Sequence, residues 1–556
     1  MVDLDAVSAE TLTRYNTAIA QWTRLSGSAD ERSAAEYVAG ELRALGLMTQ
    51  VILHDAYISL PGPATLRVTS PRAQELFCIT HSMGRPTSPG GVTAELVYAG
   101  RGSLADYAAA GAAGKMALVE GRATPQHAVN ATRAGALGIV AISGRHAHEM
   151  CCSPVWGNPS HSTMGELPHA HLLSVHQADG EALRALCQAG RVEVAFTAAV
   201  ETGWTKTPIV VGDLPAGHPQ AEPGKYVLFS GHLDSWYVGA MDNGSANATM
   251  LEVARLMSAR RGAMRRALRI AFWSGHSHGR YSSSAWYADS HWADLRAGCA
   301  IHVNIDSVGA VDADDFGTNS MPETAQVAVD AVREVADAQL DAHRVGRNSD
   351  QSFWGLGIPS LLGSVSRQRD HSLGWWWHTP HDTLDKIDPV RLVRDAKIFA
   401  RVIGRLCEEA VLPLDYAASA ADLRAGIELA ARQAGGVVDL GPVVEEATRL
   451  EGLCRRLMEA AGRAGDAAAP AINACYQALG HALIPVGYTA AGPFAHDAAL
   501  ETGFLPPLRP ARRLEGLDPG SDEAKFLAVD LVRGRNAVAA ALRQACAAAE
   551  ACLSGL

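Results

Sequence analysis

The sequence predicts an α/β protein built around a mostly parallel, mixed sheet with helices on both faces. Between residues 201 and 416, apolar runs of strand length alternate with stretches of helical periodicity, which is the pattern of parallel strands joined by crossover helices. The run YVLFSGHLDS indicates a buried strand with a polar end, and ATMLEVARLM after it places apolar residues on one helical stripe. A chain of 556 residues also exceeds a single hydrophobic core, so about two to four domains are expected.

The chain divides into an opening segment, an insert, a core and a helical end. Residues 1–60 contain two helical patterns, the clearer being SADERSAAEYVAGELRALGL, followed by the strand MTQVILHDAYISL. Residues 61–200 alternate short β stretches with Ala-rich helices and indicate a separate α/β insert. The core occupies residues 201–416 and continues the opening segment. Residues 417–556 have helical periodicity, interrupted by a Pro/Gly-rich loop, and predict a helical domain.

Composition restricts the partners and the compartment of this protein. A net charge of −11, with no basic run, argues against nucleic acid or an anionic membrane as a partner. The sequence contains no stretch of about 18 apolar residues, so no transmembrane helix is predicted. The amino terminus lacks the features of a signal peptide. The ten cysteines are scattered, with only Cys151 and Cys152 adjacent, which favours reduced thiols. We therefore expect a cytoplasmic protein without a membrane or nucleic-acid partner.

A metal site is predicted where the strand YVLFSGHLDS meets the following helix. His232 ends that strand and Asp242 lies in the loop, and a neutral imidazole close to a carboxylate binds a borderline divalent ion well. Asp234, two residues after His232, can orient the imidazole ring from behind. The structural alternative is that Asp242 and Asn243 only cap the helix.

Three later stretches supply further candidates. Asp306 ends the strand CAIHVNIDSVG, Asp350 precedes a short strand in GRNSDQSFWGLGIPSLL, and WWWHTPHDTLDKID contains His378 and Asp382. Each candidate lies at a strand end or in a loop. Because open α/β sheets bind ligands at the carboxyl ends of their strands, this scattered set of His and Asp residues strengthens the metal interpretation.

The order and the residues of these motifs resemble those of the co-catalytic zinc metallopeptidases of the aminopeptidase, glutamate carboxypeptidase and transferrin receptor type. The motifs GHxDS, DNGS, NxD, SD and HTxxDT of that family all have counterparts in this chain. The resemblance implies a zinc aminopeptidase-like fold in which His232, Asp242 and Asp306 form one metal site. It further implies that Asp242 bridges to a second site completed by His378.

The same resemblance assigns roles to the two flanking regions. The segments GKMALV and AGALGIV within residues 61–200 resemble the protease-associated insert that sits over the active site. We expect this insert to act as a lid that contacts the mouth of the cleft near His378. Residues 417–556 resemble the dimerisation domain, so we expect a homodimer through this region. Amphipathic helices that only cover their own core are the alternative.

One stretch departs from the family, in which a strand ends in two adjacent glutamates followed by xG. The first glutamate is the general base and the second is a ligand of the second metal. The sequence here is IAFWSGHSHGR, which places His276 at the base position and Ser277 at the ligand position of the same strand. Because a serine hydroxyl is a poor ligand for a divalent cation, the second site should be weaker. His276 could act as base or as nitrogen ligand, whereas His278 should lie on the other strand face and only contact structure.

Residues near these motifs could contact the substrate. Arg280 and Arg347 could face the cleft and pair with a substrate carboxylate, although a surface salt bridge is the default for any arginine. Trp377 precedes His378 and could form an apolar wall beside the metal, while packing that anchors the loop is the alternative.

These observations predict a metal-dependent hydrolase of a peptide or amide bond that acts on a small peptide or amide through metal-activated water. The expected cofactor is one or two divalent ions, zinc first, with Mn, Co or Fe as alternatives. His276 would move a proton between water and the leaving nitrogen, and Asp234 would support His232. The alternative, favoured by the missing glutamate pair, is a catalytically inactive peptidase-like binding protein that keeps the fold.

Overall fold

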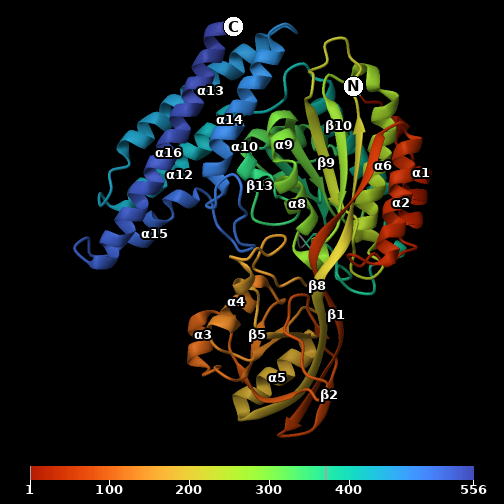
Figure 1. Ribbon diagram of the computed structural model, residues 1–556, viewed down its shortest axis with the longest axis vertical. Helices are drawn as coiled ribbons and strands as arrows, with labels where there is room; N and C mark the ends of the chain where they lie inside the picture. The colour runs from red at the N-terminus through yellow and green to blue at the C-terminus, as the bar shows by residue number, and fades with distance from the viewer. Residues whose placement is uncertain (1, 370–371) are drawn as a thin grey trace.

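The core of the protein is a mixed sheet, as the computed structural model of residues 2–369 and 372–556 shows (Figure 1). Its strands are β1 (Met48–Ser70), β8 (Val192–Leu214), β9 (Tyr226–His232), β10 (Ala267–Trp273), β11 (Cys299–Ile305), β12 (Asp315–Ser320), β13 (Asp341–Arg344) and β14 (Ser360–Gly363). They run in the order β13-β12-β14-β11-β9-β10-β8, with β1 paired to β8. The central ladders from β10 through β9 and β11 to β14 are parallel, and the pairs of β8 with β10 and with β1 are antiparallel.

Helices cover both faces of this core sheet. On one side lie α1 (Ala9–Ile19), α2 (Ala29–Ala44), α6 (Ala246–Ala259) and α11 (Pro389–Glu408), and on the other lie α8 (Ser282–Ser290) and α9 (Trp292–Gly298) (Figure 1). The sequence explains α2 well. Ser28 caps its first turn by accepting a hydrogen bond from the backbone of Glu31, and its Val38 and Leu42 are buried against the sheet.

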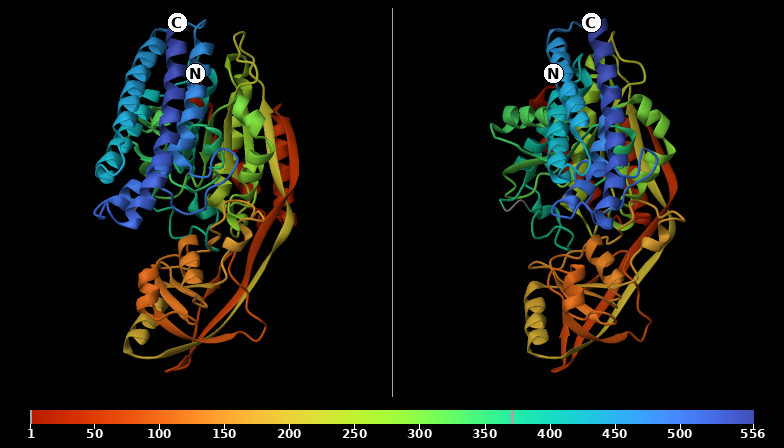
Figure 2. Two further views of the ribbon diagram at one scale, coloured as in Figure 1. Left: turned by 60° about the vertical axis from the view of Figure 1, so that its left-hand side comes forward. Right: turned by 90° about the vertical axis from the view of Figure 1, so that its left-hand side faces the viewer.

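The insert is a second α/β body joined to the core by two long strands. Its strands are β2 (Gln74–Leu76), β3 (Ile79–Thr80), β4 (Val92–Tyr98), β5 (Met116–Glu120), β6 (Gly138–Ile142) and β7 (His171–Val175), and its helices are α3 (Leu104–Ala109), α4 (Pro125–Arg133) and α5 (Gln177–Ala189). β1 and β8 pair along almost their whole length and run from the core into the insert (Figure 2). The domain limits expected at residues 60 and 200 therefore fall inside two continuous strands, because one antiparallel ribbon serves both sheets.

The carboxyl-terminal region is helical. It contains α12 (Tyr416–Ala434), α13 (Gly441–Arg463), α14 (Ala469–Tyr488), the short α15 (Pro510–Leu514) and α16 (Asp522–Gly555), and it meets the core at α10 (Pro322–Ala336). Its buried apolar residues, such as Leu457, belong to the same hydrophobic cluster as Val227 of β9. The helical region and the core therefore share one interior rather than meeting at a polar boundary.

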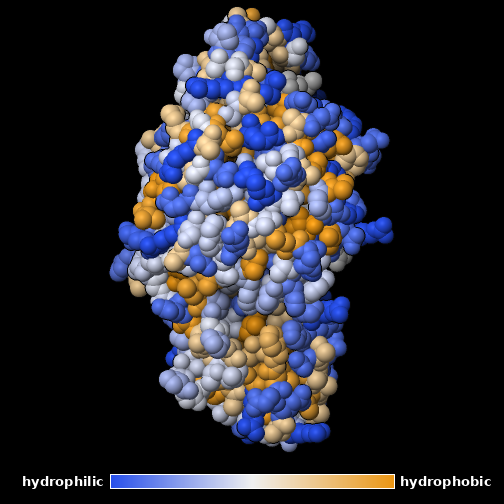
Figure 3. Space-filling view, turned by 90° about the vertical axis from the view of Figure 1, so that its right-hand side faces the viewer, coloured by the Kyte–Doolittle hydropathy of each residue, from blue (hydrophilic) through white to orange (hydrophobic). Residues whose placement is uncertain are grey.

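On the face that carries α1 and α2, apolar and polar side chains are interspersed, with a group of apolar residues on the insert (Figure 3). Across the part of the chain that the structure describes, no helix is both long and apolar enough to cross a membrane.

Candidate metal centre

The predicted ligands lie at the carboxyl edge of the core sheet. β9 ends at His232 in the middle of the sheet, and Asp306 directly follows the neighbouring β11. Asp242 lies in the turn Ala240–Ser245 between β9 and α6, and His378 lies in the loop that precedes α11. The parallel arrangement of β9 and β11 thus brings residues that are far apart in the sequence to one edge.

The distances between these side chains are those of a carboxylate shared by two imidazoles. Nε2 of His232 lies 3.0 Å from Oδ1 of Asp242, and Nε2 of His378 lies 3.0 Å from Oδ2 of the same carboxylate. Oδ1 of Asp306 lies 3.7 Å from Nε2 of His232. The structure therefore brings together His232, Asp242 and Asp306, and places Asp242 between His232 and His378 as the resemblance implies.

Hydrogen bonds orient both imidazoles with Nε2 toward the shared carboxylate. Nδ1 of His232 lies 2.8 Å from the backbone oxygen of Asp234, and Nδ1 of His378 lies 2.5 Å from the backbone oxygen of Glu149. Protein histidines that bind metal are held in this way, because a donor at one ring nitrogen leaves a lone pair on the other. Nε2 of His232 and Oδ1 of Asp242 are buried and face each other at 3.0 Å, and neither forms a hydrogen bond of good geometry with any described residue. Two buried ligand atoms that face each other in a nitrogen and carboxylate donor set fit a divalent metal ion.

The carboxylates around His232 favour a positive charge at the site. Burial acts to lower the pKa of His232, but the carboxylates of Asp234, Asp242 and Asp306 outweigh it and hold that pKa well above its ordinary value. Burial would likewise raise the pKa of Asp242, yet His232 and His378 hold it below its ordinary value. The carboxylates give the site an excess of negative charge. A divalent ion between these groups would balance that charge, as a proton on His232 also would.

Asp234 lies behind the metal ligands rather than among them. Its fully buried carboxylate accepts hydrogen bonds from the hydroxyl of Ser26 at 2.7 Å and from the backbone of Ser277 at 2.9 Å, with the backbone of His276 at 3.3 Å. Oδ1 of Asp234 lies 3.6 Å from Nδ1 of His232. The residue predicted to support His232 therefore also holds the turn that carries His276 and Ser277.

The turn that replaces the glutamate pair is helical, which corrects the strand placement expected from the sequence. β10 ends at Trp273, Gly275 has a positive φ of 64°, and α7 (His276–Gly279) begins immediately after it. A left-handed residue at this point is well suited to glycine and turns the chain out of the strand. Strand alternation therefore does not decide which of these side chains faces the metal site.

His276 and His278 point in different directions from this turn. The ring of His276 stacks on that of His232, with centroids 3.8 Å apart and 11° between the planes. His232, His276 and Asp306 form a group whose ligand atoms all lie within 4.8 Å of one another. His278 is fully buried, with Nδ1 3.0 Å from the hydroxyl of Ser26 and no hydrogen-bond partner for Nε2 among the described residues. His276 thus faces the metal site and His278 packs into the interior.

The two arginines expected near the substrate differ in their surroundings. The guanidinium of Arg347 lies 3.9 Å from the ring centroid of Trp156, and its Nη2 donates to the backbone oxygen of Asp497 at 2.7 Å. Arg280 has its guanidinium 4.9 Å from the ring of Tyr281, and within residues 2–369 and 372–556 it forms no ion pair. Arg347 therefore packs on Trp156 and donates to a backbone oxygen, whereas Arg280 has no ion pair in this part of the chain, and Nε of each arginine lacks a hydrogen-bond partner among the described residues.

The insert contacts the loop that carries His378, as expected of a lid. The backbone N–H of Glu149 donates to the backbone oxygen of His378 at 3.0 Å, and Nδ1 of His148 lies 2.6 Å from the backbone oxygen of Trp377. Trp377 itself stacks on the ring of His378, with centroids 3.4 Å apart. The predicted contact between the insert and the mouth near His378 is present, and Trp377 supports the ligand ring on one side.

Two residues of the site were not assigned a role from the sequence. Asp350 is fully buried and its Oδ2 lies 2.8 Å from Nδ1 of His276, and its position in an SD motif is the one signal that could have indicated it. Glu149 contributes its backbone oxygen to His378, and no sequence pattern marks such a contact. Side-chain chemistry is visible in a sequence, but a backbone acceptor is not.

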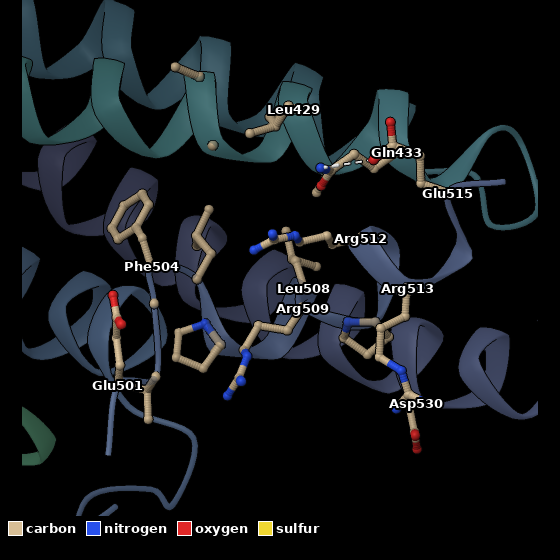
Figure 4. Close-up of a pocket in the computed structure, with 18 of the residues that line it drawn as sticks. Leu429, Gln433, Glu501, Phe504, Leu508, Arg509, Arg512, Arg513, Glu515 and Asp530 are labelled. Carbon is tan, nitrogen blue, oxygen red and sulfur yellow. Dashed lines mark hydrogen bonds between the residues drawn. The ribbon is translucent and has the colours of Figure 1, made fainter. Parts of the chain in front are cut away.

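A large cavity lies elsewhere, in the helical region. It has a volume of about 1460 Å³ between α12 and the segment that leads into α16 (Figure 4). Leu429 of α12 faces Leu508, Arg509 and Arg512 across this space (Figure 4). None of the predicted metal ligands lines it, so its size does not identify the metal centre.

Comparison with known proteins gives a family for part of this chain. Residues 210–403 match the model described as peptidase family M28. The "Probable glutamate carboxypeptidase VP8" of Zea mays is 25% identical over 489 residues, covering 73% of this chain and 67% of that protein. "Aminopeptidase YwaD" of Bacillus subtilis is 26% identical over 381 residues, covering 66% of this chain and 78% of that protein.

Solved structures share the fold. The aminopeptidase from Aneurinibacillus sp. strain AM-1 has a TM-score of 0.58 at 23% identity and covers 73% of this chain and 95% of that chain. BSAP, a zinc aminopeptidase from Bacillus subtilis, has a TM-score of 0.56 at 22% identity and covers 74% of this chain and 96% of that chain. At these identities the likeness concerns the fold, and it confirms the predicted α/β architecture.

Proposed function

We propose that this protein, whose residues 210–403 belong to peptidase family M28, is a metal-dependent hydrolase of a peptide or amide bond in a small substrate. The observation that carries the proposal is the carboxylate of Asp242, which lies 3.0 Å from Nε2 of both His232 and His378. Relatives described as an aminopeptidase and a glutamate carboxypeptidase support the same reaction class.

The metal would be held by residues already arranged for it. His232, Asp242 and Asp306 would form the tighter site, while the second site would have His378, the shared Asp242 and no carboxylate at Ser277. Zinc is favoured, because a structure of the same fold is a zinc aminopeptidase, and Mn, Co and Fe are the alternatives. When bound, such an ion polarises the scissile carbonyl and lowers the pKa of water at the site.

His276 would move the proton. Its ring lies against His232 and within 4.8 Å of the ligand atoms of His232 and Asp306, at the position where the resembled family has its glutamate base. In the proposed reaction Nε2 of His276 accepts a proton from the attacking water, the carbonyl carbon gains the hydroxyl and the C–N bond breaks. The same proton then passes to the leaving nitrogen, so that an amide and water yield an acid and an amine.

Metal depletion tests this proposal directly. Chelated and zinc-restored protein would be compared on aminoacyl p-nitroanilides and N-acyl dipeptides, with zinc measured by elemental analysis. We expect turnover only after zinc is restored, and His276→Ala should lower turnover by at least roughly a hundredfold with zinc retained. The exposed His161 of the insert provides the control His161→Ala, which should change neither quantity. Zinc bound at full occupancy without turnover on any substrate would instead favour an inactive peptidase-like binding protein.

Substrate selection is proposed to involve Arg280. Its guanidinium has no ion-pair partner in residues 2–369 and 372–556 and lies four positions after His276, so a substrate carboxylate could satisfy it. Arg280→Gln should raise KM for dipeptides with a free carboxylate and leave KM for the matching amides unchanged. Equal changes in KM for both substrate series would contradict a carboxylate contact. Arg347 and Trp377 are proposed to shape the mouth through the packing described above.

The helical region is proposed to form a homodimer, and the insert to be a protease-associated domain, in a cytoplasmic protein. Phe526 is 73% exposed and Val529 is 50% exposed on neighbouring positions of α16, which supports a covered apolar face. Light scattering at micromolar concentration should show a dimer for the parent chain. The double variant Phe526→Asp, Val529→Asp should be monomeric, and a monomeric parent would contradict the proposal.

A further inference from the structure

Asp350 is a buried carboxylate aimed at the proposed base. It is fully buried, its Oδ2 lies 2.8 Å from Nδ1 of His276, and its Oδ1 accepts a hydrogen bond from the hydroxyl of Ser284 at 2.9 Å. A carboxylate without solvent needs such donors, because burying an unpaired charge is costly. Both of its oxygens are therefore engaged, and one of them is engaged by the imidazole.

This contact decides which nitrogen of His276 can act. When Nδ1 carries the hydrogen that it donates to Asp350, Nε2 has the free lone pair. The ring is held on both sides, because it stacks on His232 at 3.8 Å and meets the edge of Tyr281 at 4.9 Å. His276 is thus fixed in both orientation and tautomer by groups from separate segments of the chain.

Replacing a glutamate base by histidine adds one positive charge to the base position, and the carboxylate of Asp350 can offset that charge. A glutamate base is negative before it takes a proton and neutral afterwards, whereas an imidazole is neutral before and positive afterwards. Beside a divalent ion a positive imidazole is unfavourable, and a carboxylate at the far ring nitrogen offsets that charge. A histidine at this turn therefore needs an anion behind it, and Asp350 is in that place.

We propose that Asp350 is a positioning residue that forms a dyad with His276, and that the dyad replaces the carboxylate base at this turn. The inference rests on the proposed hydrolase function. During proton transfer from water, the new hydrogen goes to Nε2 of His276 while the hydrogen on Nδ1 stays in place, shared with Asp350. The hydrogen on Nε2 then passes to the leaving nitrogen, and the dyad returns to its starting state.

The dyad is also connected to the insert. The hydroxyl of Ser284, which donates to Asp350, lies 3.0 Å from the hydroxyl of Ser352, and Ser352 accepts a hydrogen bond from Nε1 of Trp156 at 2.9 Å. Trp156 belongs to the insert, and its ring lies against that of Tyr281, with centroids 4.3 Å apart. The orientation of Asp350 therefore depends on a polar chain that ends in the insert.

A double-mutant cycle separates this role from a structural one. Four zinc-loaded proteins are compared: the parent, Asp350→Asn, His276→Glu, and the two changes together. In the parent background Asp350→Asn should lower kcat by about 10²- to 10⁴-fold with KM nearly unchanged. In the His276→Glu background the same change should cost less than about threefold, because a glutamate base needs no anion behind it. An equal loss in both backgrounds would overturn the proposal and show that Asp350 only maintains the fold.

Two readouts do not depend on turnover. Zinc content should stay at the parent level in Asp350→Asn, and loss of zinc would overturn the proposal by showing that His276 is a ligand. In ¹⁵N-histidine spectra of the zinc-loaded protein, the signal absent from His276→Gln should report hydrogen on Nδ1, and Asp350→Asn should change that tautomer. The spectra decide the question even if no substrate is turned over, in which case the hydrolase function fails separately. A His276 signal with hydrogen on Nε2 in the parent would also overturn the dyad.

Discussion

Replacement of Glu323 by glutamine should remove a pH-dependent loss of stability where the core meets the helical region. Glu323 lies in the first turn of α10, is 1% exposed and has no hydrogen-bond partner of good geometry for either carboxylate oxygen among the described residues. Burial raises its pKa from 4.5 to about 7, the carboxylates of Asp422 and Asp415 act in the same direction, and its own backbone N–H and the hydroxyl of Ser419 oppose them only in part. The folded protein therefore favours the protonated acid.

The sign and size of the effect follow from these two pKa values. Below pH 4.5 the carboxyl is protonated in both states, so it costs nothing. As the pH rises from 4.5 to 7, the unfolded chain ionises first and the free energy of unfolding falls, and above pH 7 the loss is complete. The full loss is about 3 kcal/mol, of which about 2 kcal/mol develops between pH 5 and pH 8. Glutamine cannot ionise and avoids this loss.

Urea unfolding followed by tryptophan fluorescence at pH 5 and pH 8 measures this difference. Relative to the parent, the free energy of unfolding of Glu323→Gln should rise by about 2 kcal/mol between the two pH values. The exposed Glu10 of α1 supplies the control, since Glu10→Gln should follow the parent at both pH values. If Glu323→Gln also followed the parent, the carboxyl would be ionised in the folded protein at pH 5 and the burial argument would be refuted.

Further changes test the metal centre. His232→Ala should remove most bound metal by elemental analysis, whereas His378→Ala should remove mainly the weaker ion, and an unchanged first site in His232→Ala would contradict the ligand assignment. Ser277→Glu should raise the affinity for a second ion at least about tenfold in a zinc titration, because it adds a carboxylate at this position. The serine hydroxyl there is buried and has no hydrogen-bond partner in the described structure. An unchanged affinity would count against Ser277 as the position of a ligand. His278→Ala should lower the free energy of unfolding by about 2 kcal/mol through loss of the contact with Ser26, without loss of metal.

Sequence motifs indicated the family resemblance and the candidate ligands because each motif is a local feature. His232 and Asp306 each sit at the end of a buried strand, and the apolar run before each one predicts that strand without any knowledge of its neighbours. Residues 210–403 match the model of peptidase family M28, in agreement with the resemblance. The strand predicted through His276 and Ser277 was wrong because Gly275 adopts a positive φ, and an apolar pattern does not report the direction in which a chain leaves a strand.

The sequence by itself determined the candidate ligands and the candidate base, and the tertiary structure decided how they face one another. Nδ1 of His378 meets the backbone oxygen of Glu149 in the insert, and Nδ1 of His276 meets the carboxylate of Asp350 in a distant loop. These contacts join segments far apart in the chain, and any residue has a backbone oxygen that can accept. Residue type therefore predicts a ligand, whereas its tautomer and orientation are set by hydrogen-bond partners that only the folded chain brings within reach.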